Sequence, residues 1–326
     1  MDDVLSRLAV LYEACRDGTS ARRSESEVLE VQHLWKTVEA LLTTLKPQDL
    51  CINDGAFAKL LACVNAEFLL MPKSSVISTG DRTAFEIANR VLVKIGCRGE
   101  EEREVILREA LVVRLVQVLK EEAVNLAPSE VAVVLHVFQT LAFDSKRRVE
   151  LFQRDVVPAA TGAMGRYPNE IQVQVSGCKF LQYMAYEETT KECIIQNQGV
   201  EALLQALDKF GSNVQLACSA LDALYFLSID LEAVLLHHES KFTVAMESIV
   251  QRVAGVVQCH EQVEQLQAHG VAILLTFCGP HAAARRALCT YELWQIARSA
   301  FEANEDAASD TIAMLGVIFE DAEDGS

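Results

Sequence analysis

Histidine and acidic side chains stand together near residue 238, where their chemistry would suit a metal ion. His237, His238 and Glu239 are consecutive, and imidazole and carboxylate groups are both zinc ligands. Consecutive residues of a helix point about 100° apart, however, so these side chains cannot hold one ion together. The sequence therefore predicts no metal site at this position.

A second, looser group of cysteines and histidines follows within the next 45 or so residues. Its spacings match no zinc pattern, and Cys278 falls at a small, apolar position of a helical stripe. We interpret these residues as core and surface residues rather than ligands, and we expect no cofactor. The group comprises Cys259, His260, His269, Cys278 and His281.

Motifs for nucleotide chemistry and for nucleophilic catalysis are missing from the chain. The sequence contains neither GxxxxGK[ST] nor GxGxxG, and it has no GxSxG motif and no paired Cys/His signature. We therefore predict that the protein is not an enzyme and takes no small-molecule substrate. Ser24 follows two arginines in the polar stretch 17–27, which makes it a candidate phosphorylation site; the alternative is a solvated polar loop.

The composition is that of an acidic chain that folds. Of its 326 residues 51% are hydrophobic and 23% charged, and the length suits two domains, one large domain or a repeat array. The net charge of −17 repels polyanions and anionic membrane surfaces. We therefore expect no nucleic-acid partner.

The features that would direct the chain out of the cytoplasm are also missing. The N-terminal stretch 1–11 is interrupted by charges, and no apolar run approaches the roughly 20 residues that span a bilayer. Ten scattered cysteines without a CxxC motif suit reduced, mostly buried thiols. The sequence predicts a cytoplasmic protein without membrane insertion.

Apolar residues recur at spacings of three and four along the chain, which is the period of an α-helix. In the segment 170–184, for example, Ile171, Val175 and Cys178 continue into Leu181 and Met184 on one stripe. Strand patterns and hairpin turns are almost absent. The fold class is therefore predicted to be all-α.

Comparison of the chain with itself shows an internal repeat. A shift of 43 residues aligns 169–210 with the segment from 212 onward, placing Leu181 on Leu224 and Tyr183 on Phe226. A shift of 50 continues the pattern to Cys278. We predict an N-terminal helix and polar loop over 1–28, about six repeats over 29–320 that are clearest at 129–253, and an acidic tail over 321–326.

The repeated pattern resembles the armadillo repeat family, which is close to the HEAT-like α-solenoids. The resemblance lies in a helix that reads GCKFLQYMA and in the segment IIQNQGVEALLQAL, where a turn glycine precedes a long amphipathic helix. It implies a right-handed α-α superhelix (a solenoid) with a concave groove. It also implies a scaffold or adaptor that binds a protein or peptide segment; the alternative is a regulator of a small GTPase or kinase that binds a folded domain.

The resemblance also points to partner-binding positions. In armadillo proteins the third helix of each repeat lines the groove, and the contacting residues lie six and two positions before its closing small residue. The repeated Trp and Asn of nuclear-import members are missing here, which argues against that role. The corresponding residues are Trp35, Glu39, Arg90, Lys94, His136, Thr140, Lys179, Tyr183, Asp222, Phe226 and Thr276.

Two aromatic residues stand out among these positions. Tyr183 and Phe226 are equivalent in adjacent repeats, so we expect their rings about 10 Å apart, the packing distance of neighbouring helices. Aromatic side chains are enriched at binding hot spots. We therefore predict that both rings seat apolar side chains of a partner, while Arg90 and Lys179 attract acidic flanks.

Overall fold

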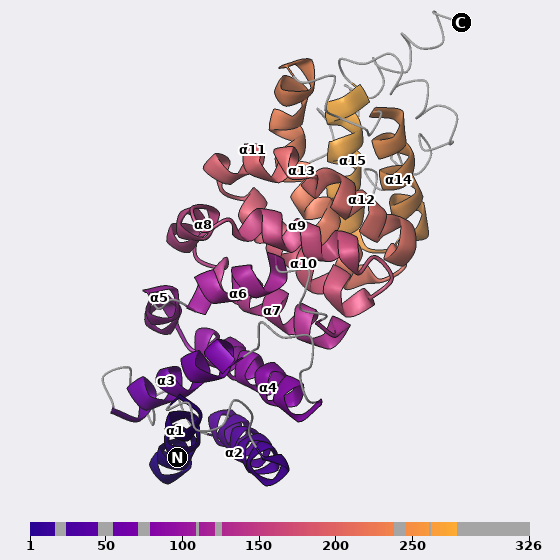
Figure 1. Cartoon of the computed structure of the whole chain (residues 1–326). Coiled ribbons are helices and arrows are strands. Elements are labelled where there is room, and N and C mark those ends of the chain that lie inside the picture. Colours follow the sequence, from indigo (N-terminus) through magenta and orange to yellow (C-terminus); the bar gives the residue numbers. More distant parts are fainter. Residues whose placement is uncertain are drawn as a thin grey trace, which may run out of the picture. The chain divides into compact units, whose positions relative to one another are not determined.

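The computed structural model describes residues 1–16, 24–44, 55–70, 79–108, 111–120, 126–237, 246–260 and 262–278. Every regular element in these ranges is an α-helix, which confirms the predicted all-α class (Figure 1). The helices are α1 (Asp2–Arg16), α2 (Glu25–Thr44), α3 (Gly55–Leu70), α4 (Thr79–Gly96), α5 (Glu100–Arg108), α6 (Leu111–Lys120), α7 (Pro128–Leu141), α8 (Ser145–Phe152), α9 (Val156–Arg166), α10 (Ile171–Ala185), α11 (Glu188–Gln196), α12 (Gly199–Phe210), α13 (Val214–His237), α14 (Met246–Cys259) and α15 (Glu264–Cys278).

The central helices follow a three-helix repeat. A short first helix of eight or nine residues (α5, α8, α11) is followed by a second helix (α6, α9, α12) and a third (α7, α10, α13). Each helix alone has an apolar face that must be covered, and stacking of neighbouring repeats covers it. The predicted repeat therefore corresponds to one structural unit.

The chain forms two compact bodies, Met1–Phe180 and Leu181–Ser326, which we call the N-terminal and C-terminal bodies. In the N-terminal body α1, α3, α6 and α9 contact one another in sequence, and so do α2, α4 and α7. In the C-terminal body α12 contacts α14, and α13 contacts α15. Each body therefore has one layer of second-type helices and one layer of third-type helices.

Small residues at the ends of the third helices are buried as predicted. Gly96 ends α4 and Ala185 ends α10, and a Cβ atom on Gly96 would lie 2.8 Å from Thr140 Cγ2. Ser228 is buried too, but it does not close its helix: α13 runs on to His237. The third helix of that repeat thus continues into the segment that aligns with the short first helix α11 under the shift of 43 residues.

The turns before α9 and α12 each use a left-handed residue. Asp155 and Gln198, one predicted repeat of 43 residues apart, have φ of 57° and 60°. Gly199, interpreted as the turn glycine, is instead the first residue of α12, and a Cβ there would lie 2.8 Å from the carbonyl oxygen of Ile194. Glycine is required at 199 for space, whereas the positive φ falls on the residue before it.

A recurring glutamine ties third helices to second helices. Nε2 of Gln174 in α10 donates to the carbonyls of Met164 (2.9 Å) and Tyr167 (3.0 Å) at the end of α9. Gln267 in α15 makes the same two bonds to the end of α14. One shift of 43 and one of 50 relate the two glutamines, so the structure reproduces both shifts.

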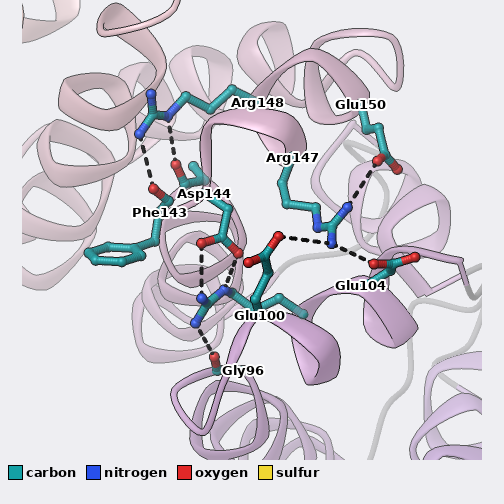
Figure 2. A network of polar contacts seen from close by, with 10 residues as sticks. Gly96, Glu100, Glu104, Phe143, Asp144, Arg147, Arg148 and Glu150 are labelled. Carbon is teal, nitrogen blue, oxygen red and sulfur yellow. Dashed lines mark hydrogen bonds and ion pairs between the residues drawn. The ribbon is translucent and has the colours of Figure 1, made fainter.

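A buried ion-pair network joins neighbouring repeats in the N-terminal body, and Figure 2 shows it from close by. Arg103 of α5 donates from Nε and Nη2 to both carboxylate oxygens of Asp144, at 2.5 and 2.9 Å, and from Nη1 to the Gly96 carbonyl at 2.7 Å. Arg147 of α8 reaches Glu104 at 2.8 Å. These bonds fix the corner between α7 and α8 against α5.

Six cysteines are free thiols and are less uniformly buried than predicted: Cys63, Cys97, Cys178, Cys193, Cys218 and Cys259. Burial raises the pKa of Cys178 to about 12 and that of Cys63 to about 11. Cys97 and Cys259 are exposed. None of the helices in the part of the chain that the structure describes has the length and apolar character needed to cross a membrane.

Candidate functional site

Two of the predicted cations, Arg90 and Lys94, already have partners within the N-terminal body. Arg90 donates from Nε to Glu39 (3.0 Å) and from Nη1 to Glu86 (2.8 Å), and hydrogen bonding to Glu39 raises the pKa of its guanidinium. Lys94 donates to Thr43 Oγ1 at 2.9 Å. The positive charge of Arg90, predicted with Lys179 to attract acidic partner flanks, is therefore balanced by Glu39 and Glu86.

Two other predicted contact residues belong to the core. Trp35 is fully buried, and its Nε1 donates to Tyr12 Oη at 2.7 Å, which joins α2 to α1. Thr140 packs against Gly96, and its hydroxyl donates to the His136 carbonyl at 2.8 Å. Both residues therefore stabilise the fold, and we correct their assignment as partner contacts.

His136 is the exposed member of the predicted set in α7. Desolvation by its surroundings lowers the pKa of the imidazole, although the residue keeps a large solvent-accessible fraction. A neutral imidazole at this position offers one donor and one acceptor to a partner. His136 thus remains a candidate contact residue.

A continuous row of five rings crosses three helices of the C-terminal body, and we call it the aromatic row. From α10, Tyr183 contacts Tyr186 with ring centroids 6.3 Å apart, and Tyr186 meets Phe226 of α13 edge to face at 4.6 Å. Phe226 contacts Tyr225 at 5.2 Å, and Tyr225 stacks on His269 of α15 at 5.3 Å with an interplanar angle of 4°. Tyr186 is 37% exposed and the other four are half-buried.

A buried polar layer centred on Asp222 supports the row. Asp222 is only 3% exposed and accepts from Nε2 of Gln182 at 2.5 Å and from Nε2 of Gln265 at 3.2 Å. His269 contacts the same carboxylate, with its Nδ1 on Oδ1 of Asp222. A buried carboxylate requires such donors, because an unpaired one would be strongly destabilised. Asp222 was predicted to contact a partner directly, but it instead links α10, α13 and α15.

The row and the polar layer share residues. Gln182 donates both to Asp222 and to Tyr186 Oη, at 2.8 Å for the latter, and His269 contacts both Asp222 and the Tyr225 ring. The orientation of the rings is thus set by hydrogen bonds as well as by packing. The predicted pair of Tyr183 and Phe226 does lie in this row, with Tyr186 between them.

Sequence reasoning missed five residues of this arrangement. Tyr186 lies one position beyond the closing small residue, and Tyr225 directly precedes the predicted Phe226, so the rule of six and two positions selects neither. Gln182 and His269 take part because neighbouring helices approach closely. Gln265 of α15 completes the set and lies at no position that the family rule selects.

The remaining predicted residues lie on the same helices. Lys179 is half-buried on α10, one turn before Tyr183, and Thr276 belongs to the last turn of α15. Of the cysteine and histidine group, His260 bonds the Gly211 carbonyl at 2.6 Å and His269 belongs to the row. Within the described ranges no three His, Cys, Asp or Glu residues are arranged to hold a metal; His238, Glu239 and His281 lie outside those ranges.

Ser24 stands at the start of α2. Its backbone N–H donates to Glu27 Oε2 at 2.7 Å and its Oγ accepts from the Glu27 backbone N–H at 3.4 Å, which forms a capping box; the hydroxyl also donates to Glu27 Oε2 at 2.7 Å. The serine therefore has a structural role as N-cap. The arginines that precede it lie outside the described residues.

The fold is similar to those of solved designed armadillo repeat proteins. YIII(Dq.V1)4CPAF, solved in complex with the peptide (KR)4, matches with a TM-score of 0.53 at 12% identity over 79% of this chain and 99% of that one. YIII(Dq)4CqI matches with a TM-score of 0.53 at 11% identity over 82% and 99%. No protein-family model and no curated protein matches the sequence. The chain therefore has an armadillo-like repeat fold, as the sequence predicted.

Proposed function

We propose that this protein is a non-catalytic interaction scaffold that holds a segment of a partner protein on its third helices. The aromatic row carries the proposal. It offers partly exposed rings on three successive helices, α10, α13 and α15, which are joined by the Asp222 layer. A surface built on rigid helices loses little conformational entropy when it binds.

The chemistry of the row suits a binding surface better than it suits catalysis. Tyrosine and phenylalanine rings supply large contact areas with few rotatable bonds, and tyrosine is enriched in the residues that dominate binding energy. The Asp222 carboxylate is engaged by Gln182, Gln265 and His269. Asp222 therefore has a structural role in joining the helices and is not available to react with a substrate.

The fold supports a peptide or extended segment as the partner. One structural neighbour, a designed armadillo repeat protein, is in complex with a peptide. The same layered arrangement of third helices is present in each body of this chain. We further propose that the protein binds no nucleic acid, because its net charge is −17. We also propose that it acts in the cytoplasm, because its scattered cysteines without a CxxC motif suit reduced thiols.

Selection from a random-peptide display library followed by calorimetry tests this function. Peptides selected on the wild-type protein and then synthesised should bind Tyr183→Ala and Phe226→Ala variants about 1–3 kcal/mol more weakly, as hot-spot truncations do. Phe143→Ala is the matched control, because Phe143 is an exposed aromatic of the N-terminal body. Far-UV circular dichroism confirms that each variant is folded.

Two results would contradict the proposal. Selected peptides that bind the Tyr183→Ala, Phe226→Ala double variant as tightly as wild type would show that the row is only solvated surface. A selection that yields no peptide, while a folded GTPase or kinase domain binds the purified protein, would favour the alternative of a regulator that recognises a folded partner.

A further inference from the structure

Charge is divided very unequally between the two bodies. The N-terminal body has 22 Lys and Arg against 25 Asp and Glu, whereas the C-terminal body has 7 against 21. The described residues of the C-terminal body alone include 3 Lys and Arg against 10 Asp and Glu. A partner approaching the aromatic row therefore meets a negative field, which attracts cations and repels acidic segments at long range.

The row itself favours a cation at short range. The face of an aromatic ring is electronegative and attracts a guanidinium or ammonium group within about 6 Å of its centroid. Asp222, which is 3% exposed and shares Gln182 as a bonding partner with Tyr186, adds a carboxylate whose charge is poorly screened by water. The acidic surroundings at long range and the ring faces at short range thus both favour a cationic group of the partner.

An intramolecular contact shows which cation this fold places on such a ring. Phe143 stands one repeat of 43 residues before Tyr186, at the equivalent position after the third helix, and is 59% exposed. The guanidinium carbon of Arg103 lies 5.5 Å from the Phe143 centroid. A planar guanidinium stacks on a ring better than a compact, strongly hydrated ammonium does.

We propose that the aromatic row recognises a basic segment that seats an arginine side chain on Tyr186 and Phe226. The inference rests on the proposed scaffold function and specifies the charge class of its partner. It replaces the expectation of acidic flanks, because Arg90 is paired with Glu39 and Glu86. The acidic C-terminal body would then steer the segment toward the row.

Four synthetic peptides test this charge preference by fluorescence polarisation. They share the same length and two leucines, and they differ only at three positions, which carry arginine, citrulline, lysine or glutamate. Citrulline keeps the planar shape of arginine and removes its charge. We expect the arginine peptide to bind about 10-fold more tightly than the citrulline peptide, with lysine between them and glutamate weakest.

Variants of Tyr186 and Phe226 test whether the preference for arginine arises at these two rings. Tyr186→Leu and Phe226→Leu keep apolar volume and remove the ring face, so each should reduce the arginine advantage about 3- to 10-fold. Phe143→Leu should leave it unchanged, because Arg103 already lies over that ring. Raising NaCl from about 50 to about 300 mM should weaken the arginine peptide more than the citrulline peptide.

The outcomes separate this inference from the function on which it rests. Citrulline or glutamate peptides that bind as well as the arginine peptide would overturn the charge preference and leave the scaffold function intact. An arginine advantage that survives both ring variants would also overturn it, since the cation would then be bound elsewhere. Binding of no peptide at about 1 mM would overturn both.

Discussion

The buried pair of Arg103 and Asp144 should behave as one coupled unit in the stability of the N-terminal body. The two side chains are 11% and 16% exposed and form a bidentate ion pair, and Arg103 also bonds the Gly96 carbonyl. Arg103→Met removes the donor and leaves a mostly buried carboxylate and a carbonyl without partners. Asp144→Asn removes the charge and keeps the shape.

The structure sets the size of these effects. Removing one member of a buried ion pair costs about 3–5 kcal/mol, because the other charge stays buried. Since both side chains keep some exposure, we expect about 3 kcal/mol for Arg103→Met and about 2 kcal/mol for Asp144→Asn. The double variant should cost about 3 kcal/mol, well below the sum, since no uncompensated charge remains.

Urea unfolding followed by circular dichroism at 222 nm measures this double-mutant cycle, provided that the slope with urea is the same in all four proteins. Arg7 and Glu30 provide the control. They form a bidentate pair of similar geometry (2.6 and 3.0 Å) but are 51% and 37% exposed. Their removal should leave the unfolding midpoint almost unchanged.

Strictly additive effects of Arg103→Met and Asp144→Asn would refute the reasoning, because they would show that neither residue depends on the other. An equally large loss from the exposed pair would refute it too, since burial would then not decide the energy. Either result would mean that the contacts drawn in Figure 2 do not couple the contributions of these residues to the free energy of unfolding.

Three further measurements follow from individual residues. Gly199→Ala should destabilise the protein by about 2 kcal/mol or more in urea unfolding, whereas Gly165→Ala, where a Cβ meets nothing within 4 Å, should be neutral or slightly stabilising. Burial raises the pKa of the Glu130 carboxyl, so its contribution to stability is largest at low pH and is lost as pH rises; Glu130→Gln should therefore gain stability over wild type at pH 7 and lose that gain near about pH 4. Mass spectrometry after iodoacetamide treatment of the native protein at pH 7.5 or so should find Cys97 alkylated and Cys178 intact, because burial raises the pKa of the latter to about 12; early alkylation of Cys178 would contradict its burial.

Periodicity was sufficient to predict the fold. Stacked repeats need the same apolar and small positions in every unit, so buried Ala142 and Ala185 and the bonded Gln174 and Gln267 recur at the predicted shifts. A fold built from equivalent contacts leaves this record in the sequence. The two left-handed residues were not predicted, because Asp155 and Gln198 share a conformation and not a residue type.

The candidate surface was harder to predict for a physical reason. The family rule selects positions along one helix, whereas exposure depends on the helices packed beside it. Trp35 and Asp222 occupy selected positions and are covered, by Tyr12 and by Gln182 and other donors, while Tyr186 lies off the rule and is exposed. Side-chain burial is decided by neighbours that no single repeat contains.

The unbroken helix α13 also has a mechanical consequence. Other third helices end near their small residue, where a corner can bend, but α13 passes Ser228 without a break and extends nine residues further, to His237. That extension is about 13 Å long at 1.5 Å per residue. Phe226 lies about 16 Å from that end, so a tilt of α13 by about 10° at the rings would displace the end by about 3 Å. The continuous helix therefore links the position of Tyr225 and Phe226 geometrically to that of its own C-terminal end.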